Sequence, residues 1–164
     1  MGIYIRPAGL ADRPLIDGLL SAVYPRLLLD DYDGHAVNAI LPLLDRANPK
    51  LLESGSYYML FERLELVAVG GWTATAPGED CPEGTGHVRH VATHPDHLKK
   101  GHASRLMRHI RDKARAGGVR RLDCLSSLNA RPFYARQGFD DHGIDEAPIA
   151  PGITFPVVRM AAAI

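Results

Sequence analysis

Residues 91–107 constrain the fold more than any other stretch, because they predict a strand that passes through a short turn into an amphipathic helix. The helix begins at or near Gly101, and its first amides lie at the positive end of the helix dipole without partners inside the helix. Gly101 and Ala103 leave room for an anion beside the backbone, and Lys99 and Lys100 add two positive charges. The stretch therefore predicts a phosphate-binding junction, with an ordinary strand-to-helix turn as the alternative.

The length and composition favour one globular domain. A chain of 164 residues is expected to form a single domain over residues 1–164. Charged residues make up 23% of the chain and cancel formally, which argues against nucleic-acid and membrane surfaces as partners. Charges also interrupt the first thirty residues, so we expect no signal peptide or membrane span and a cytoplasmic location. Cys81 and Cys124 lack metal-ligand spacing and are expected to be free thiols.

The hydrophobic pattern predicts a mixed sheet covered by helices, which is an α/β (α+β) fold. We expect strands at residues 3–6, 56–62, 64–75, 87–93, 121–126 and 157–160, with Phe139 in a further closing strand. We expect helices at residues 10–23, 35–44, 101–116 and 129–137. Loops are expected at residues 48–49 and 76–86, where proline and glycine interrupt the pattern.

Four segments together resemble the GNAT superfamily of N-acetyltransferases. They are residues 5–12, residues 66–71, the Gly101 junction, and residues 129–139, which end in Phe-Tyr-Ala-Arg-Gln-Gly-Phe. The resemblance covers nearly the whole chain. It implies a mostly antiparallel central sheet that splays open between strands 4 and 5, with acetyl-CoA in the gap as the acyl donor. It also implies direct acetyl transfer to a primary amine, without an acetyl-enzyme intermediate.

The resemblance assigns cofactor-binding roles to three parts of the chain. It implies that the backbone of Val91, Ala92 and Thr93 pairs with the pantetheine arm. The pyrophosphate is expected on the turn and helix start, which comprise Leu98, Lys99, Lys100, Gly101, His102, Ala103 and Ser104. Asn129 and Arg136 match positions near the cofactor in the family.

Two positions of the expected cradle depart from the family. The family usually has Arg or Gln where this chain has Leu98, and glycine where it has Lys99. We expect these departures to weaken phosphate binding without abolishing it, because backbone amides provide most of the contacts.

The resemblance also indicates catalytic residues. Tyr134 matches the family tyrosine beside the cofactor sulfur, where a phenol can protonate the departing thiolate; a purely structural core tyrosine is the alternative. His87 aligns where some members carry a glutamate base, and a neutral imidazole can accept a proton near neutral pH. A packed or surface histidine is the alternative, and strand alternation places His90 on the opposite face from His87.

A metal site is the competing interpretation of the histidines. His87, His90, His94 and His97 have helical spacing and could together hold zinc. Pro95 and the β-branched residues between them make a continuous helix improbable, so we predict no metal.

The acceptor is constrained only weakly. In this fold the N-terminal helices and their loop would contact the amine, and acids there could attract it: Asp30, Asp31, Asp33 and Glu53. Aromatic side chains could line the same side, namely Tyr24, Tyr32, Tyr57, Tyr58 and Trp72. Solvated acids and core aromatics are the alternatives. A small-molecule amine is the expected acceptor, and a protein or peptide amine or a non-catalytic acyl-CoA-binding regulatory module are the alternatives; family habits suggest a homodimer.

Overall fold

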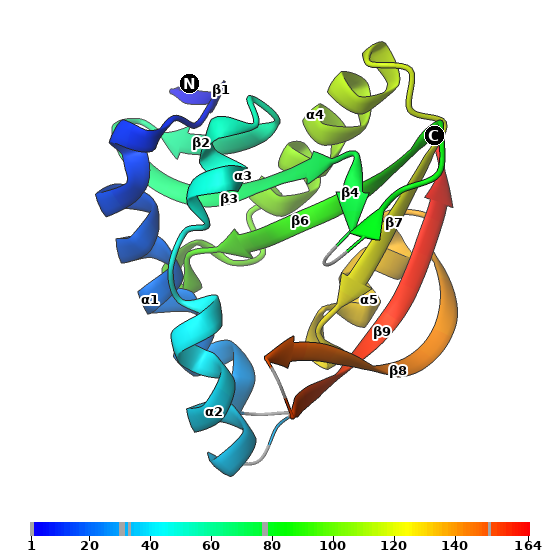
Figure 1. Cartoon of the computed structure of the whole chain (residues 1–164). Helices are drawn as coiled ribbons and strands as arrows, with labels where there is room; N and C mark the ends of the chain where they lie inside the picture. Colours follow the sequence, from blue (N-terminus) through cyan, green and yellow to red (C-terminus); the bar gives the residue numbers. More distant parts are fainter. Residues whose placement is uncertain (1, 30–31, 33, 77–78, 151) are drawn as a thin grey trace.

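One seven-stranded sheet organises the chain in a computed structural model that describes residues 2–29, 32, 34–76, 79–150 and 152–164. The strands lie in the order β1-β2-β3-β6-β7-β9-β8 (Figure 1). Their bounds are β1 Ile3–Pro7, β2 Tyr57–Glu62, β3 Glu65–Thr73, β6 Thr85–Thr93, β7 Arg121–Ser126, β8 Asp140–Ala150 and β9 Ile153–Ala163. All neighbouring pairs are antiparallel except β6 and β7. The predicted mixed, mostly antiparallel sheet with flanking helices is confirmed.

Helices cover both faces of this sheet. They are η1 Leu10–Asp12, α1 Arg13–Leu29, α2 Gly34–Leu44, α3 Pro49–Glu53, η2 Pro95–His97, α4 His102–Ala116, η3 Leu128–Ala130 and α5 Arg131–Arg136. Figure 1 shows α1 and α2 on one side of the sheet and α4 on the other. Among the residues that the structure describes, no helix combines the length and apolar character that crossing a membrane requires.

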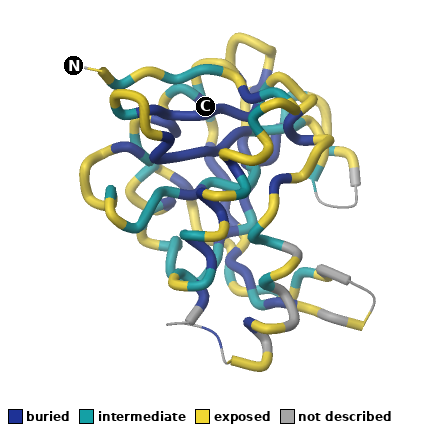
Figure 2. Tube along the Cα trace, turned by 90° about the vertical axis from the view of Figure 1, so that its left-hand side faces the viewer, coloured by how far each residue is buried: buried dark blue, intermediate teal, exposed yellow. Residues whose placement is uncertain are grey.

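Each face of the sheet has its own hydrophobic core. The core under α1 and α2 includes Ile16, Leu20 and Met59, all fully buried. The other core forms because α4 presents an apolar stripe, consisting of Leu106, Met107, Ile110 and Ala114, to the opposite face. Burying a large aliphatic side chain contributes about 1.5–3 kcal/mol, so the two cores hold the helices in place. Figure 2 shows buried segments through the interior and exposed ones mainly at the turns.

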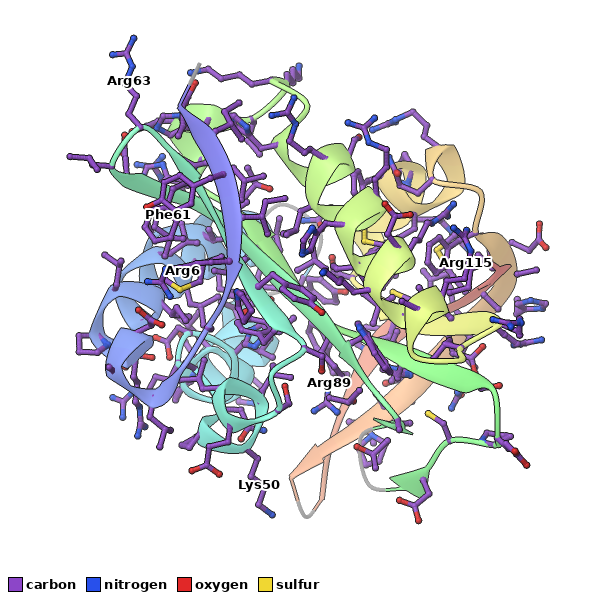
Figure 3. The ribbon with its side chains drawn as sticks, turned by 90° about the horizontal axis from the view of Figure 1, so that it is seen from above. Arg6, Lys50, Phe61, Arg63, Arg89 and Arg115 are labelled. Carbon is purple, nitrogen blue, oxygen red and sulfur yellow. The ribbon has the colours of Figure 1, made fainter. Side chains whose placement is uncertain are left out.

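The N-terminal edge is closed by a polar and aromatic cluster. The Arg6 guanidinium donates two hydrogen bonds to the Asp12 carboxylate, at 2.7 and 2.9 Å. Its carbon lies 5.3 Å from the centre of the Phe61 ring, which also stacks on Tyr4 (Figure 3). The ion pair lowers the pKa of Asp12, because the guanidinium bonds to its charged form. These contacts attach η1 to the β1–β2 edge.

Four local predictions were wrong in extent. The helix expected at 10–23 begins as η1 and continues as α1 to residue 29. The expected loop at 48–49 opens α3, because the Asn48 side chain accepts a hydrogen bond from the Lys50 amide at 3.0 Å and caps that helix. The expected loop 76–86 contains a small hairpin of β4 Thr75–Ala76 and β5 Glu79–Asp80.

The fourth concerns the closing strands, which form one long β8–β9 hairpin, with Phe139 just before β8. Exposed polar residues in β8 break the apolar alternation that would reveal a strand in the sequence.

Close packing at Gly71 generates a stability prediction. A Cβ at Gly71 would lie 2.2 Å from the Ser56 carbonyl oxygen and 2.6 Å from the Tyr57 Cα, both backbone atoms of the neighbouring strand region. Gly71→Ala should therefore lower the free energy of unfolding by roughly 2–3 kcal/mol in urea denaturation. Gly18→Ala is the matched control, since Gly18 lies inside α1 with open space at its Cβ position; it should stabilise by about 0.5–1 kcal/mol. Equal stability of the two variants would contradict this packing.

Candidate functional site

The sheet opens between β6 and β7, as the resemblance predicts for strands 4 and 5. These parallel strands pair only over residues 85–87 of β6 and 121–123 of β7. Figure 1 shows them leaving the same corner of the sheet and separating toward their C-terminal ends. Beyond His87, β6 remains paired with β3 while β7 pairs with β9. Val91, Ala92 and Thr93 therefore present one backbone edge toward the opening, and an extended ligand could hydrogen-bond there as an added strand.

A β-bulge at His90 accompanies this opening. Val69 pairs with Ala92 and Gly71 pairs with Arg89, so two residues of β6 lie opposite Gly70 alone. His90 takes a left-handed backbone conformation, with φ 50°. Bulges of this kind bend a strand and increase its twist, which directs the end of β6 away from β7.

Buried contacts hold the bulge in place. The Tyr57 hydroxyl donates to the His90 carbonyl at 2.9 Å, and His90 Nε2 lies 3.0 Å from the Leu44 carbonyl, to which it donates. The His90 ring also packs on Tyr24 at 5.2 Å between centroids. Burial lowers the pKa of His90 to about 4, so its ring is neutral and serves as a structural donor at neutral pH.

The bulge corrects the prediction that His87 and His90 lie on opposite faces. Val88 packs in the core under α4, so its neighbour His87 points to the other face. His90 contacts α1 and α2 on that same face as His87, because the extra residue shifts the strand alternation by one position. The sequence has no clear signal for this bulge.

The predicted phosphate cradle is a turn with two left-handed residues. Lys99 has φ 62° and Gly101 has φ 81°, so the turn requires a conformation that glycine adopts freely and lysine does not. The first helical bond of α4 joins the Arg105 amide to the Gly101 carbonyl at 3.0 Å. The amides of His102, Ala103 and Ser104 therefore precede the helical hydrogen bonds, at the positive end of the helix dipole.

Side chains around the turn divide into exposed and buried groups. Leu98, Lys99 and Lys100 are exposed, and the Lys100 ammonium group lies 3.5 Å from His97 Nδ1. His102 is only 3% exposed, and its ring points toward Glu62, so only its backbone is available to a phosphate. The Ser104 hydroxyl accepts a hydrogen bond from the Gln137 side chain at 2.9 Å, which ties α4 to the end of α5.

Asn129 and Arg136 occupy different environments. Asn129 donates to the Leu27 carbonyl and accepts from the Ser127 hydroxyl at 2.8 Å, so its amide joins η3 to α1. Arg136 is exposed in the last turn of α5. The structure thus links Asn129 to the helices beside the opening and leaves Arg136 accessible to a ligand.

Tyr134 is buried on α5, next to β7. Its ring lies against Phe133 and Phe139, with centroids 5.1 and 5.4 Å away, and its hydroxyl donates to the Cys124 thiol of β7. Burial, reinforced by Cys124, raises the pKa of Tyr134 well above its ordinary value. Burial likewise raises the pKa of Cys124 to about 12. Both groups therefore keep their protons at neutral pH.

His87 is buried on β6 and carries no charge at neutral pH. Its side chain is 5% exposed, and burial together with the positive charge of Arg89 lowers its pKa to about 4. A general base works best when its pKa is near the working pH. The environment therefore makes His87 a weak proton acceptor, even though it supplies the neutral imidazole that the sequence predicts.

The predicted acceptor-side residues are mostly core residues. Tyr24, Tyr32, Tyr57 and Tyr58 are buried, and Trp72 is partly buried. Glu53 is exposed at the end of α3, whereas Asp30, Asp31 and Asp33 lie outside the described residues.

Sequence reasoning did not single out Arg89 of β6 (Figure 3). It lies two residues after His87, and strand alternation therefore places both on the same face. Its guanidinium is half-buried and donates to two neutral oxygens, Thr73 Oγ1 at 3.1 Å and the Thr75 carbonyl at 3.3 Å. Nothing in the local pattern distinguishes this arginine from a surface one.

The four histidines of the metal alternative do not form a helix. His87 and His90 lie in β6, His94 caps η2 through its ring nitrogen, and His97 ends η2. A shallow, mostly apolar depression of about 440 Å³ lies elsewhere, between α1 and the start of β3, beside His94. It includes none of the predicted cofactor-binding or catalytic residues.

The geometry of the opening and a match to a family model together identify the family of this chain. The family model described as acetyltransferase (GNAT) family matches residues 25–139. The chain therefore belongs to the GNAT family of acetyltransferases.

Similar proteins agree with this membership. An amino-acid acetyltransferase from Neisseria meningitidis is 38% identical over 69 residues, which are 42% of this chain and 15% of that protein. A GCN5-related N-acetyltransferase from Rhodopseudomonas palustris has a TM-score of 0.81 at 19% identity, covering 100% of this chain and 97% of that chain. An N-acetylglutamate synthase from Neisseria gonorrhoeae, in complex with coenzyme A and N-acetyl-glutamate, has a TM-score of 0.67 at 20% identity. That match covers 98% of this chain and 35% of the synthase, so the shared part is the fold of one domain.

Burial of neutral His87 predicts a pH-dependent stability. The unfolded chain protonates this histidine near its ordinary pKa of 6.5, whereas the folded protein resists protonation down to about 4. The free energy of unfolding therefore carries no penalty from His87 above about pH 6.5, and it falls as the pH drops toward 4. From about pH 7.5 to about pH 5, His87 should account for a loss of roughly 2 kcal/mol. When urea denaturation is measured at both pH values, the free energy of unfolding of His87→Asn should fall by roughly 2 kcal/mol less than that of the unaltered protein. If both proteins lose the same free energy, His87 is not protected from protonation.

Proposed function

We propose that the protein is an acetyl-CoA-dependent N-acetyltransferase in which a primary amine attacks the thioester directly. The opening between β6 and β7 is the observation that carries this proposal, because it lies between the cradle at residues 98–104 and the buried Tyr134. Membership of the GNAT family supports the reaction class. We further infer one catalytic domain over residues 1–164 and a cytoplasmic location; the β8–β9 hairpin is where we would expect a homodimer to form.

The backbone would do most of the cofactor binding. In the proposal, Val91, Ala92 and Thr93 pair with the pantetheine arm, and the amides of residues 98–104 bind the pyrophosphate. Lys99 and Lys100 are exposed beside that turn and would add charge. Asn129 and Arg136 would contact the cofactor from the α5 side. Leu98 offers no polar group, so we expect weaker binding than an arginine or glutamine at this position would give.

Tyr134 would supply the proton for the leaving group. The amine nitrogen attacks the thioester carbon, and the carbon–sulfur bond breaks as the Tyr134 hydroxyl donates a hydrogen bond, and then its proton, to the departing thiolate. The proton that the attacking nitrogen loses passes to water, and water returns one to the tyrosinate, so Tyr134 ends the cycle protonated. Because burial keeps that phenol protonated, the donor is ready before the substrate arrives. The hydroxyl would exchange its present Cys124 partner for the thiolate, to which a hydrogen bond is stronger because it is charged.

Proton removal from the amine does not require a strong base in this proposal. His87, with a pKa of about 4, cannot hold the ammonium proton at neutral pH. We therefore infer that the acceptor reacts as a neutral amine. The proton that its nitrogen loses after attack passes through water to solvent, and His87 at most relays it. The nearby positive charge of Arg89 also favours the neutral form of an amine.

An amino acid is the acceptor class that we propose to test first. The hydrogen bonds of the half-buried Arg89 to other described residues go to neutral oxygens, on the face that carries His87. A carboxylate is the strongest partner for a guanidinium, so an amino acid could place its carboxylate there and its amine toward the opening. The local similarity to an amino-acid acetyltransferase supports the same class. A protein or peptide amine remains an alternative, to be included in the assay.

Calorimetric titration with acetyl-CoA, followed by free-thiol release against amino acids, polyamines and peptides, tests this function. We expect binding and amine-dependent release, strongest with an amino acid. Gly101→Val should weaken binding at least about tenfold, because valine strains the left-handed turn that positions the amides. Gly55→Val is the control, since Gly55 has φ 78° with equally open surroundings far from the turn in sequence. Binding without release for any amine would favour the regulatory module, and no binding would refute the proposal.

Removal of the Tyr134 hydroxyl tests the proton donor. Tyr134→Phe should lower kcat at least about tenfold and leave the dissociation constant of acetyl-CoA nearly unchanged, because the ring still fills the same space. Cys124→Ala is the control, since it removes the resting partner of the hydroxyl but keeps the phenol. We expect Cys124→Ala to retain turnover. Unchanged kcat in Tyr134→Phe would remove this residue from the mechanism.

A further inference from the structure

Three metal-binding side chains meet beside the predicted phosphate turn. Glu62 comes from the end of β2, His97 from η2, and His102 from the first position of α4. One ligand atom from each lies within 4.8 Å of the other two. Glu62 Oε2 is 3.1 Å from His97 Nδ1 and 3.5 Å from His102 Nε2. Residues far apart in the sequence thus converge on one point.

His102 is the most informative member of the group. It is only 3% exposed, and its Nε2 is buried without a hydrogen-bond partner. The 3.5 Å separation from Glu62 Oε2 is within the range of an ion pair but lacks hydrogen-bond geometry. Buried polar atoms normally have partners, so this nitrogen points to a ligand between it and Glu62.

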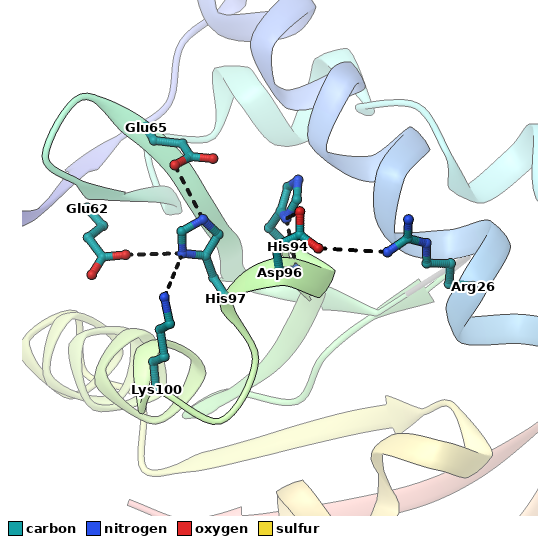
Figure 4. Close-up of polar contacts among 7 residues, drawn as sticks. All are labelled: Arg26, Glu62, Glu65, His94, Asp96, His97 and Lys100. Carbon is teal, nitrogen blue, oxygen red and sulfur yellow. Dashed lines mark hydrogen bonds and ion pairs between the residues drawn. The ribbon is translucent and has the colours of Figure 1, made fainter.

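Glu65 completes the arrangement around His97. Its Oε2 lies 3.3 Å from His97 Nε2, on the side of the ring opposite Glu62 (Figure 4). Histidines that bind metals usually donate the proton of their second nitrogen to a carboxylate. When His97 Nε2–H donates to Glu65, the Nδ1 lone pair faces the Glu62 carboxylate at 3.1 Å, an arrangement of two acceptors that suits a cation between them.

The same structure shows that a cation is favoured at this place. Lys100 Nζ lies 3.5 Å from His97 Nδ1 (Figure 4). Lys100 is exposed, so its long side chain can move away when another cation enters. With Glu62 and Glu65 both acidic, the group retains a net negative charge that attracts a divalent ion.

We propose that Glu62, His97 and His102 bind a divalent transition metal of the zinc type, with Glu65 orienting His97. Two imidazole nitrogens and one carboxylate form a donor set used by zinc, with a fourth position open to water. Zinc bonds of about 2.0–2.1 Å in a tetrahedron place ligand atoms about 3.3–3.4 Å apart, close to the two separations from Glu62. Nitrogen donors argue against calcium or magnesium, which prefer oxygen.

The position of this site suggests what the metal would do. His97 and His102 stand on either side of residues 98–101, the turn with the strained Lys99. A metal bound to both would hold the two ends of the turn together. Metal binding would therefore stabilise the turn at residues 98–101. The site itself does not depend on the proposed acetyl transfer.

Metal binding can be measured on the full chain without any activity assay. We would remove metal with a chelator, dialyse, and titrate Zn²⁺ by calorimetry, with Co²⁺ absorption reporting the coordination. One ion per chain is expected. Glu62→Gln and His97→Asn should each weaken binding at least about tenfold, and Glu65→Gln about tenfold through the loss of ring orientation. Thermal denaturation of the metal-free variants verifies that they fold.

His142→Asn is the matched control, because His142 is exposed on β8 and outside the group. Its Zn²⁺ affinity should equal that of the unaltered chain. No Zn²⁺ binding by the metal-free protein would overturn the proposal and leave a cluster of ion pairs. Binding that persists equally in the folded Glu62→Gln and His97→Asn variants would also overturn it, since the ion would then be held by other surface groups.

Discussion

The bulge at His90 is the constraint on which the rest of the structure depends. A parallel pair such as β6–β7 would normally continue along both strands, but here it ends after three residue pairs. The left-handed backbone at His90 bends β6, and the buried bonds from Tyr57 and to Leu44 keep it bent. Gly70 makes the bend compatible with β3, because a Cβ there would lie 2.8 Å from the Val91 side chain. The opening is therefore built into the core before any ligand arrives.

The turn that follows β6 stores backbone strain at Lys99. A non-glycine residue at φ 62° costs about 1 kcal/mol or more, so neighbouring contacts must maintain that conformation. His97 contacts Glu62 and Glu65 before the turn, and His102 is buried toward Glu62 after it. Both ends of the turn are thus attached to the β2–β3 hairpin. The family glycine would remove the strain but also one of the two charges beside the predicted phosphate.

Hydrophobic periodicity and glycine stops in the sequence predicted the elements whose ends depend on neighbouring residues. Residues 101–116 have helical spacing and a glycine stop, so α4 could be placed within one residue, and Arg121–Ser126 was placed without error. The face of His90 could not be predicted, because it depends on a bulge stabilised by Tyr57 and Leu44, which are distant in sequence. The meeting of Glu62 with His102 could not be predicted for the same reason: the two lie far apart in the sequence, and only the folded sheet brings them together.

Burial keeps Tyr134, Cys124 and His87 uncharged at neutral pH. It raises the pKa of Tyr134 and of Cys124 and lowers the pKa of His87, so each group retains its neutral form. In the proposed reaction a neutral phenol can donate a hydrogen bond to the thiolate, whose charge appears only as the thioester breaks. A neutral imidazole with a pKa of about 4 does not suit removal of an ammonium proton. In the proposed reaction the phenol therefore stabilises the departing thiolate by a hydrogen bond, and the acceptor reacts in its neutral-amine form because the buried imidazole cannot remove an ammonium proton.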